Sequence, residues 1–567
     1  MFVRERLQLL MVLLLFLLAA SEVRAEEEWD VVVYGATPAG ISAALAAVEA
    51  NSRVGVLLME PTREIGGMVT AGGIGMRDFR VEQRLTGKLL QWAMTNAAHY
   101  GVSYPVWQPD NWVGNRTFWS MLEAAGIPVV LGARIQEGPA GVQVSGSRQV
   151  VGGRRISRLR TVDGRGFALS RNAVVVDASY EGEVMMGAGV SYTWGREDRT
   201  TYNESYGGII GSSAAQFKLA VDAQWANGTL LHYVTKGPDP RTHVGQADRN
   251  VMAYSYRVCL TTNRTNQAPF TPPPAYRTAD FEIARRYLQE ELKAFGENGV
   301  EQPWGNLRYR SYPPANKFDA CCGNASVGID PPGLAAGYPN GTLTDRQRIA
   351  AAHRYYVQGL LWFWAGDPHS GVPDSLRNAI LQYGLCADEW PQNDHWPPQL
   401  YVREAVRMLG QHVFSQNDRV AASCDYCRPE SIALGDWGFD IHEMERVAVP
   451  SNYTASKTQA YNEGLTPPGQ GGFFVFEIPY AVLTPKQTDC VNLLVPNCPS
   501  VSHVAFAAIR EEPTLWQLGA ASGIAATLVA SNMFPTVQSV KPSVVAALLQ
   551  KQGIVTHWPS RPDCSCY

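Results

Sequence analysis

The sequence lacks the features by which nucleic-acid-binding, membrane-spanning and repeat proteins are recognised. Its 48 basic and 52 acidic residues give a formal net charge of -4, and no long basic run or aromatic-interleaved basic patch occurs. We therefore expect no nucleic-acid partner. Beyond the N-terminal segment, nothing is apolar enough to cross a bilayer, and no internal repeat stands out. The composition, 18% charged and 46% hydrophobic, is that of a globular chain, and 567 residues suggest about two to four domains.

Motifs of hydrolytic and zinc-dependent chemistry are also absent. There is no G-x-S-x-G element, which argues against a serine hydrolase. Cys424 and Cys427 form a C-x-x-C, but no second C-x-x-C or H-x-x-x-H follows at zinc-site spacing, so we predict no metal site. The pair is either a redox dithiol or a structural disulfide, and the same choice applies to Cys564 and Cys566. In an oxidising compartment the disulfide is favoured.

The N-terminus has the pattern of a secretory signal peptide. Arg4 and Arg6 precede an unbroken apolar run over 9–20, and Val23-Arg24-Ala25 resembles a cleavage site. The run is shorter than the ~20 residues that span a bilayer, so an uncleaved anchor is the weaker alternative. We predict a signal peptide over residues 1–25 and a mature protein that is secreted or lumenal and free of the membrane.

The sequons and the cysteines also fit a secreted or lumenal protein. The 10 cysteines are an even number, and most are expected in disulfides whose pairing the sequence does not give. Sequons for N-linked glycans, each weak by itself, begin at Asn115, Asn203, Asn227, Asn263, Asn324, Asn340 and Asn452.

A strand, a glycine turn, a helix and an acid follow the signal segment, in the order of a dinucleotide-binding βαβ unit. After the apolar strand over 31–34, Gly35 permits the tight turn and Gly40 lets the expected helix Pro38–Ala50 pack closely on the strand. The first amides of that helix, around Pro38 and Ala39, would face a pyrophosphate. Glu60 follows Gly40 at the offset of about 20 residues where a carboxylate meets a ribose diol. Thr37 replaces the middle glycine of the motif, which would place a side chain between the backbone and the phosphates.

A second glycine-rich segment follows the ribose acid. Gly66, Gly67 and Met68 belong to it, and its amides could wrap a cofactor that reaches toward a ring system, which favours a flavin over a nicotinamide. The alternative is an ordinary loop that needs positive φ angles. A strand is predicted over 173–177. It begins with apolar residues, and Asp177 and Ala178 follow at its C-terminal end, where central parallel strands present groups to a ligand. Between these segments, the sequence predicts a strand over 126–133 and a meander through Val144, Val150 and Ile156.

From about residue 195 to 485 the chain becomes rich in proline, tryptophan and tyrosine. Helical periodicity predicts helices at Phe281–Gly296, Thr344–Trp364 and Leu400–Gly410. We interpret residues 195–485 as a substrate domain inserted into the cofactor domain. The aromatic density suggests a substrate cavity, although tryptophans equally fill a large core.

The cofactor domain is then expected to resume. A short strand is predicted at Asn492–Pro496, and a helix of small residues at Pro513–Asn532, with Pro513 at its first position. The dipole of this helix would suit the negative charge near N1 and C2=O of a reduced flavin, and tight packing on a sheet is the alternative explanation. The predicted organisation is 26–194 and 486–540 for the cofactor domain, 195–485 for the insertion and 541–567 for a C-terminal tail.

Ordered motifs extend along most of the chain. They include 30–40, 65–78 and 177–183, and further Tyr401–Gly410, Ser431–Gly435 with Asp440–His442, Asn492–Pro496, Ser500–Phe506 and Arg510–Pro513. Together they resemble the FAD-dependent oxidoreductase family with a glutathione-reductase-type FAD fold, whose bacterial members are often secreted and some of which carry a xanthan lyase label. The resemblance implies an α/β protein: a Rossmann-like FAD-binding domain with a large inserted α+β substrate domain. The motif around 401–410 commonly carries two adjacent arginines, and here Val406 stands in place of the first.

The same resemblance implies bound FAD and hydride transfer to flavin N5, but it does not imply a substrate. Our hypothesis is a small polar substrate, such as a sugar, an alcohol or an amine. His503 is the first candidate for the base, because an unperturbed imidazole pKa of about 6.5 suits this role near neutrality. His442, beside Asp440, is the second candidate. Arg403, Arg510 and Asp78 are candidates for anchoring substrate or flavin, with structural ion pairs as the alternative.

The reduced cofactor would pass its electrons to O2 or to another acceptor. A non-catalytic secreted protein that binds a ligand or carbohydrate and has kept the fold is the alternative. The complete set of phosphate-turn residues with Glu60 argues against it, since such a protein would not need them together. A hydrolase or lyase is a weaker third reading, because polysaccharide cleavage requires no dinucleotide site.

Overall fold

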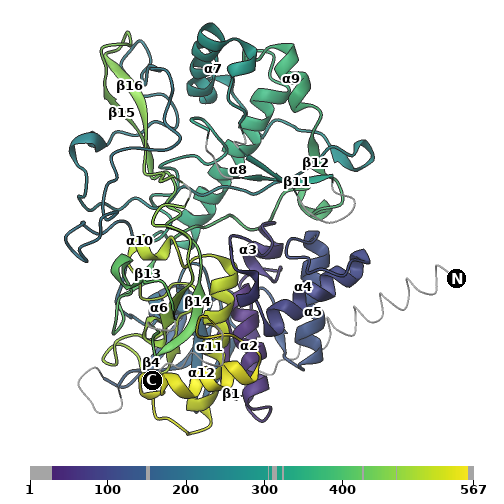
Figure 1. Cartoon of the computed structure of the whole chain (residues 1–567), viewed down its shortest axis with the longest axis vertical. Coiled ribbons are helices and arrows are strands. Elements are labelled where there is room, and N and C mark those ends of the chain that lie inside the picture. Colours follow the sequence, from purple (N-terminus) through teal and green to yellow (C-terminus); the bar gives the residue numbers. More distant parts are fainter. Residues whose placement is uncertain are drawn as a thin grey trace, which may run out of the picture.

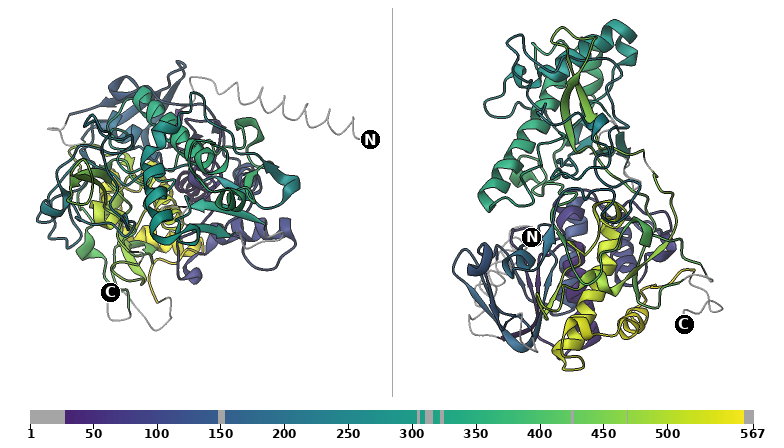
Figure 2. Two further views of the ribbon diagram at one scale, coloured as in Figure 1. Left: turned by 90° about the horizontal axis from the view of Figure 1, so that it is seen from above. Right: turned by 90° about the vertical axis from the view of Figure 1, so that its left-hand side faces the viewer.

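The computed structural model describes residues 28–147, 153–303, 306–309, 316–321, 325–423, 427–467 and 469–559. The predicted signal peptide, the sequon at Asn324 and the tail cysteines lie outside these residues. In Figure 1, a lower region contains α2, α11 and α12, and an upper region contains α7, α8 and α9. The right-hand view of Figure 2 shows the same two regions stacked along the long axis.

The lower region is built on a sheet whose central strands are parallel, as expected for an α/β protein. The strand order is β3-β2-β1-β6, and β18 pairs with the C-terminal half of β6. On the other side of β6, β5 and β4 add an antiparallel extension. These strands are β1 (Glu28–Tyr34), β2 (Val56–Met59), β3 (Val129–Val130), β4 (Val142–Ser145), β5 (Arg155–Arg160), β6 (Gly166–Asp177) and β18 (Leu493–Leu494). The predicted strands of this region are therefore confirmed, except that Val150 lies outside the described residues.

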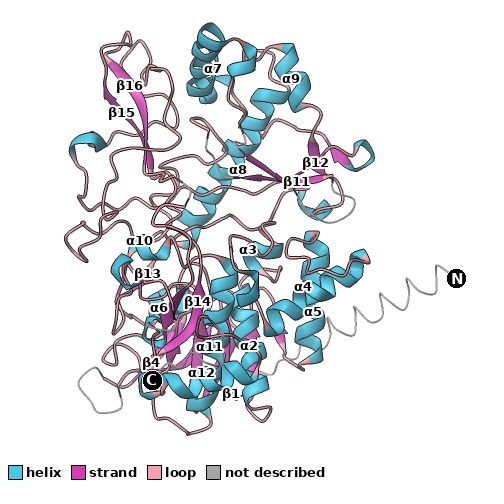
Figure 3. Ribbon diagram, viewed as in Figure 1, coloured by secondary structure: helices cyan, strands magenta, loops and turns pink. Residues whose placement is uncertain are grey.

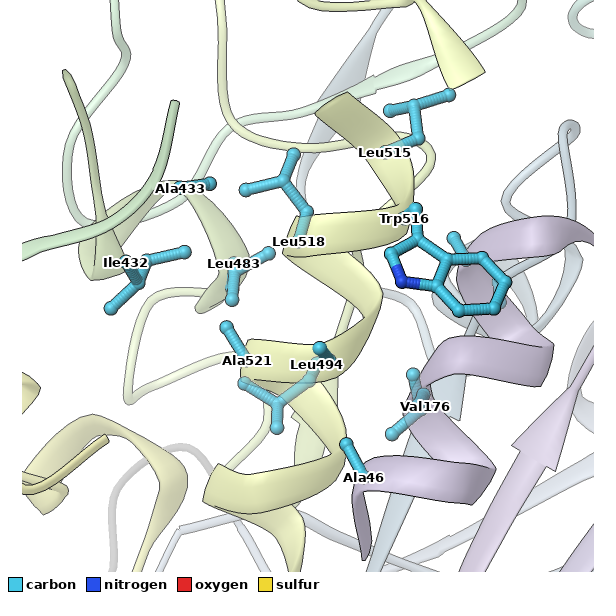
Figure 4. Packing of buried hydrophobic residues seen from close by; sticks show 14 of the residues in the cluster. Ala46, Val176, Ile432, Ala433, Leu483, Leu494, Leu515, Trp516, Leu518 and Ala521 are labelled. Carbon is cyan, nitrogen blue, oxygen red and sulfur yellow. The ribbon is translucent and has the colours of Figure 1, made fainter. Parts of the chain in front are cut away.

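Two helices, α2 (Pro38–Ala50) and α11 (Glu512–Ala530), cover one face of this sheet and pack directly on each other. Their backbones approach so closely that a Cβ on Gly519 would lie 2.0 Å from the carbonyl oxygen of Ala39, and one on Gly523 1.9 Å from that of Ala43. Small residues in α11 are thus a requirement of the packing. Figure 4 shows Trp516 and Ala521 of α11 in one cluster with Ala46 of α2 and with Val176 and Leu494 of the sheet.

Other helices and strands complete the lower region. They are α3 (Gly67–Thr70), α4 (Gly87–Tyr100), α5 (Asn111–Ala124), α6 (Glu183–Gly187), α10 (His503–Phe506), α12 (Pro542–Lys551), β7 (Tyr192–Thr193), β13 (Arg407–Met408), β14 (Ser431–Gly435) and β17 (Phe476–Pro479). Strands β14 and β17 pair with each other, and β14 packs on α11 and α12. Ile432 and Ala433 of β14 lie beside α11 in Figure 4. The chain therefore enters the lower region again within the range predicted as the insertion, and helix α12 within the predicted tail belongs to the same core.

The upper region combines a second sheet with helices and long connections, which Figure 3 shows as loops around few regular elements. Its sheet has the order β10-β11-β8-β12-β9. The elements are β8 (Cys259–Thr261), β9 (Gln267–Ala268), β10 (Asn306–Tyr309), β11 (Lys317–Cys321), β12 (Gly384–Cys386), a hairpin of β15 (Glu445–Pro450) and β16 (Thr458–Glu463), and helices α7 (Glu282–Phe295), α8 (Leu343–Ala365) and α9 (Asp374–Ile380). Helices α7 and α8 confirm two of the predicted helices. Aromatic residues such as Phe281, Tyr356 and Phe363 fill a core of their own.

The helix predicted at Leu400–Gly410 is wrong. The segment is extended, and its amides bond to separate parts of the chain: that of Tyr401 to Ser255, that of Met408 to Cys498. The spacing of its apolar residues resembled that of a helix with one buried face. In the structure the charged side chains are buried as well, with Arg403 and Arg407 at 2% and 0% exposure. Each of these charges has a partner on another element, which a straight helix would not allow.

The cysteines follow the prediction only in part. Cys259 and Cys386 form a disulfide between β8 and β12, and Cys427 is also disulfide-bonded. Cys490 and Cys498 are instead buried free thiols, because both lie in the apolar core beneath the sheet. Cys424 lies outside the described residues. Among the residues described, none of the helices combines the length and apolar character needed to cross a membrane.

Candidate functional site

The turn between β1 and α2 has the geometry expected of a phosphate-binding turn. Gly35 has a φ of +96°, and a Cβ at this position would lie 2.7 Å from the carbonyl oxygen of Ala178. A Cβ on Gly40 would lie 1.8 Å from the carbonyl oxygen of Gly35. Both predicted glycines are therefore required by the backbone, and α2 begins at Pro38 as predicted, with Ala39 buried in its first turn.

The side chain of Thr37 does not obstruct this turn, contrary to expectation. As the N-cap of α2, its hydroxyl accepts from the amide of Gly40 at 3.2 Å and donates to the carbonyl oxygen of Ala178 at 2.9 Å. The threonine is thus turned back into the protein. It replaces a glycine because it caps the helix and ties the turn to the end of β6.

Glu60 lies directly after β2 and reaches back to the same turn. One carboxylate oxygen accepts from the amide of Ala36 at 2.7 Å, and the other from the amide and hydroxyl of Thr62 at 2.7 and 2.6 Å. Burial raises the pKa of Glu60 to about 7, although these hydrogen bonds favour its ionised form. The acid predicted from spacing therefore lies at the edge of the turn.

A groove of about 230 Å³ runs along these residues, and we call it the nucleotide groove. Gly35, Thr37, Glu60, Gly67 and Tyr180 line it. The groove also carries charges that the sequence did not reveal: Arg134 and Arg346 lie 2.8 and 3.6 Å from one carboxylate oxygen of Glu183. Glu64 and Glu181 line the groove as well, so the two cations have acidic neighbours.

The second glycine segment connects this groove to a second cavity. The amide of Gly66 donates to the carbonyl oxygen of Ala36 at 2.7 Å, which ties the segment to the phosphate turn. A Cβ on Gly67 would lie 2.5 Å from the hydroxyl of Tyr180. That hydroxyl accepts from the amide of Met68 at 2.9 Å and donates to Glu512 at 2.6 Å. Tyr180 lines both cavities and forms the wall between them.

The second cavity, which we call the charged chamber, is small, at about 30 Å³, and most of its lining residues have polar or charged side chains. Its apolar walls come from Met68, Ile74, Phe506 and Leu515. Its polar walls are Arg77, Asp78, Tyr180, Tyr401, Arg403, Glu404, Asn497, Arg510, Glu511 and Glu512. Three of the predicted anchoring residues, Arg403, Arg510 and Asp78, are therefore brought together here, and the chamber lies where the two regions meet.

A chain of buried charges supports the chamber. Arg510 donates to the carboxylate of Asp440 at 2.7 Å and to the hydroxyl of Tyr401 at 3.1 Å. His442 lies between two acids, 3.5 Å from Asp440 and 3.6 Å from Asp330. Burial alone would raise the pKa of Asp440, but His442 and Arg510 outweigh it and hold that pKa well below its usual value.

Arg403 belongs to the same network of buried charges. Its guanidinium lies 2.7 Å from Asp330 and stacks 4.6 Å from the centre of the Tyr401 ring. The pKa of Asp330 is also held below its usual range: burial raises it, and Arg403 and His442 outweigh the burial. Arg403 is thus an ion-pair partner of Asp330 that also lines the chamber, and its role in anchoring substrate or flavin stays a prediction.

The sequence did not single out two acids and an amide that the structure places at the chamber. Asn497 donates to the carbonyl oxygen of Ala178 at 2.7 Å and to Thr37 at 3.1 Å, which links the phosphate turn to the chamber. Glu511 and Glu512 stand at the start of α11. Burial raises the pKa of Glu511 well above its usual value and that of Glu512 to about 8. Two acids directly ahead of a proline-started helix of small residues were the available signal.

Other predicted site residues lie away from both cavities. His503 is 1% exposed, and its Nδ1 lies 2.9 Å from the carboxylate of Glu404, whereas its ring lines neither cavity. Asp177 accepts from Ser179 and from the amide of Met185, so it fixes the loop after β6. Ala178 contributes its carbonyl oxygen to the phosphate turn, and Pro513 lies in the buried first turn of α11. A catalytic role for His503 stays a prediction.

The nucleotide groove has the features of a dinucleotide site, and the charged chamber adjoins it at Tyr180. The absence of a Cβ on Gly35 lets the turn approach the backbone of Ala178 closely, and Glu60 lines the groove. At the other end, the side-chain oxygen of Asn497 and both carboxylate oxygens of Glu511 are buried without a hydrogen-bond partner among the described residues. Buried acceptors normally bond to protein, water or ligand, so these three oxygens are the acceptors that the chamber offers to whatever occupies it.

Comparisons with known proteins agree with this geometry. The model of a family described as FAD dependent oxidoreductase matches residues 30–551. No curated protein matches the chain. Among solved structures, THI4 of Thermovibrio ammonificans is 19% identical over 33% of this chain and 71% of that chain, with a TM-score of 0.23. The family model thus matches most of the chain, whereas this solved structure overlaps only a third of it.

Two further solved structures overlap even less. The flavin-containing monooxygenase from Stenotrophomonas maltophilia is 18% identical over 32% of this chain and 44% of that chain, with a TM-score of 0.18. Thioredoxin reductase of Lactococcus lactis is 18% identical over 27% and 35%, with a TM-score of 0.15. In these two matches the chain spans less than half of the solved protein. Overlaps of this size carry no information on substrate.

Proposed function

This chain belongs to the FAD dependent oxidoreductase family, and we propose that it is a secreted enzyme that oxidises a small polar substrate in the charged chamber. FAD is its cofactor and supplies the hydride acceptor when bound. One observation carries the proposal: Tyr180 lines both the nucleotide groove and the charged chamber. The dinucleotide and the reacting group of a substrate therefore have adjoining places on the two sides of Tyr180.

The residues divide into those that hold the nucleotide and those that hold the substrate. Gly35, Thr37 and Glu60 belong to the first group, with Gly67 closing the groove against Tyr180. The second group lines the chamber, where Arg403 and Arg510 are fixed by Asp330 and Asp440 and therefore keep their orientation. Prepositioned charges of this kind orient a polar substrate without reorganisation during the reaction.

The chamber favours a small polar substrate over an apolar one. Most of its wall residues are charged or carry hydroxyl or amide groups, and its volume of about 30 Å³ leaves room for few atoms. An apolar compound would leave these groups buried without partners, which is costly. The hydroxyl or amine group of a polyol, a sugar, an alcohol or an amine is small enough to enter the chamber and supplies donors and acceptors for its walls.

Secretion is supported by the signal-peptide pattern and by the disulfide between Cys259 and Cys386. Four sequon asparagines are exposed and accessible to glycosylation: Asn203, Asn227, Asn340 and Asn452. Asn115 differs, because its amide donates to the carbonyl oxygen of Ile65 at 3.0 Å. We therefore expect glycans at the four exposed sites and none at Asn115.

The proposal is tested by spectroscopy on the purified mature protein. We expect a flavin absorbance spectrum that bleaches under anaerobic conditions when the right member of a panel of sugars, alcohols and amines is added. The rate of recovery on admitting O2, compared with a dye acceptor, distinguishes an oxidase from a dehydrogenase. Bleaching by apolar alcohols but by no polar compound would contradict the substrate class.

A further inference from the structure

We propose that Glu511 is the catalytic base, which accepts the proton of the substrate hydroxyl or amine as the hydride leaves the adjacent carbon. This assignment rests on the proposed function. The step balances. The substrate C–H bond breaks and its hydride passes to the family's cofactor, which is the oxidant, while the O–H or N–H bond breaks and its proton passes to the Glu511 carboxylate. The substrate becomes a carbonyl compound or an imine.

Glu511 is a buried acid whose carboxylate has no side-chain hydrogen-bond partner among the described residues. Glu511 is 6% exposed and lines the charged chamber. Both of its carboxylate oxygens are buried with no hydrogen-bond partner among the described residues. A buried acid without partners costs several kcal/mol in a protein. We therefore infer that Glu511 has a function that offsets this cost. A donor group of a substrate in the chamber satisfies one of these oxygens.

The second argument is that Glu511 has no structural role of the usual kind. It is the N-cap residue of α11, but its side chain makes no capping hydrogen bond. Glu512, the next residue, differs because one of its oxygens accepts from the hydroxyl of Tyr180. Of the two adjacent acids, one is therefore bound to the wall between the cavities and the other is left for a ligand.

The charges around Glu511 set its proton affinity. Burial raises its pKa, Arg510 and its own backbone amide lower it, and Asp440 and Asp78 raise it again. Arg419 also interacts with it electrostatically. The other ionisable groups of the chamber are Arg77, Arg403, Glu404, Glu512, Tyr180 and Tyr401. The result is a carboxylate of raised basicity, which takes a proton more readily than an exposed glutamate.

His503 is the alternative base, and its surroundings argue against it. Its ring lines neither cavity, and its Nδ1 is held by Glu404. Glu404 itself stands in the chamber wall and pairs with Arg407. A proton would have to cross this ion pair to reach His503, whereas Glu511 is in the wall itself.

The experiment compares Glu511→Gln and Glu511→Asp with the wild type. In flavin-loaded protein, the anaerobic rate of flavin bleaching is measured against pH with the substrate found for the wild type. We expect the wild-type rate to rise with pH to a plateau. The rate of Glu511→Gln should be at least about 100-fold lower and independent of pH, because general-base catalysis contributes about 10²–10⁴-fold. Glu511→Asp should retain the pH dependence at a reduced rate.

A second readout does not depend on catalysis. Infrared difference spectra of the cofactor-free protein across a pH titration should show the band of a protonated carboxylic acid that titrates above the usual glutamate range and is missing in Glu511→Gln. The matched control is Glu291→Gln, which removes another buried acid of raised pKa, about 7, from α7 in the upper region. This control should lose its own infrared band and keep the wild-type bleaching rate.

The outcomes separate the two proposals. If the wild type is bleached and Glu511→Gln is bleached at the same rate with the same pH dependence, the assignment of Glu511 is wrong and the proposed function stands. If flavin-loaded wild type is bleached by no compound of the panel, the proposed function is wrong and the assignment falls with it. If Glu511→Gln does not fold, the retained pH dependence of Glu511→Asp decides, and a pH-independent Glu511→Asp would contradict the assignment.

Discussion

The contact between α2 and α11 and the junction between the two regions are held together in opposite ways. In the first, helices approach until glycines are required, as at Gly519 and Gly523, and apolar side chains fill the rest. In the second, buried ion pairs join distant segments: Arg77 with Asp319, and Lys317 with Asp110. Close backbone packing fixes the nucleotide groove, whereas paired charges fix the chamber in which the substrate would lie.

The largest effect is expected from Gly519→Ala. The added Cβ would lie 2.0 Å from a backbone oxygen of α2, which cannot move without displacing the phosphate turn. We expect a loss of more than about 5 kcal/mol, at the exceptional end for one substitution, and loss of FAD binding. Denaturant unfolding and flavin absorbance check both. The control is Gly337→Ala, whose Cβ would meet its nearest atom, on Ile349, at 3.7 Å. Equal stability of the two variants would contradict the packing argument.

Removing a charge from the junction is expected to have the next largest effect. Asp319→Ala leaves Arg77 and Arg257 buried without their shared acid, and the side chains are only 2–4% exposed. The expected loss is about 3–5 kcal/mol. Asp163→Asn, which breaks an exposed pair with Arg165, should cost at most about 1 kcal/mol. Similar losses in chemical denaturation would mean that the junction does not depend on its charges.

Stability should also fall as pH rises because of Glu512. Its pKa is raised to about 8 in the folded protein, above the usual value of about 4.5, so the folded state keeps a proton that the unfolded state releases. The favourable contribution is complete below pH ~4.5 and is lost as pH rises toward 8, with a change on the order of a few kcal/mol. Glu512→Gln should therefore flatten this part of the pH–stability curve of cofactor-free protein, whereas Glu49→Gln, at an exposed position of α2, should not. Parallel curves for wild type and Glu512→Gln would refute the prediction.

The smallest effect is expected for Glu60→Gln, which affects the affinity for FAD. A charged hydrogen bond is worth about 1.5–3 kcal/mol, so affinity should fall about 10- to 100-fold above pH 7. Because the pKa of Glu60 is about 7, wild-type affinity should also weaken as pH falls below this value, and the variant should show no such change. Fluorescence titration with FAD measures both. A variant with wild-type affinity at pH 8 would remove Glu60 from the ribose contact.

The difference between the two regions explains what the sequence could predict. Gly35, Gly40 and the small residues of α11 are dictated by backbone geometry, so their spacing alone located β1, α2, Glu60 and α11. The chamber is made by residues far apart in the chain, such as Asp78, Arg403 and Arg510, which pattern suggested only one at a time. Glu511 was overlooked because its burial and its lack of a partner arise from tertiary packing. The segment 401–410 was misread as a helix for the same reason, since its buried charges are satisfied by distant partners.

FAD is expected to bind in the nucleotide groove, beside the charged chamber, and every other role proposed for the site depends on this binding. The most direct measurement is a titration of cofactor-free protein with FAD, followed by flavin absorbance and by quenching of tryptophan fluorescence. We predict stoichiometric, saturable binding that Gly519→Ala abolishes and Gly337→Ala leaves intact. Properly folded protein that neither carries flavin after purification nor binds added FAD would contradict the central claim.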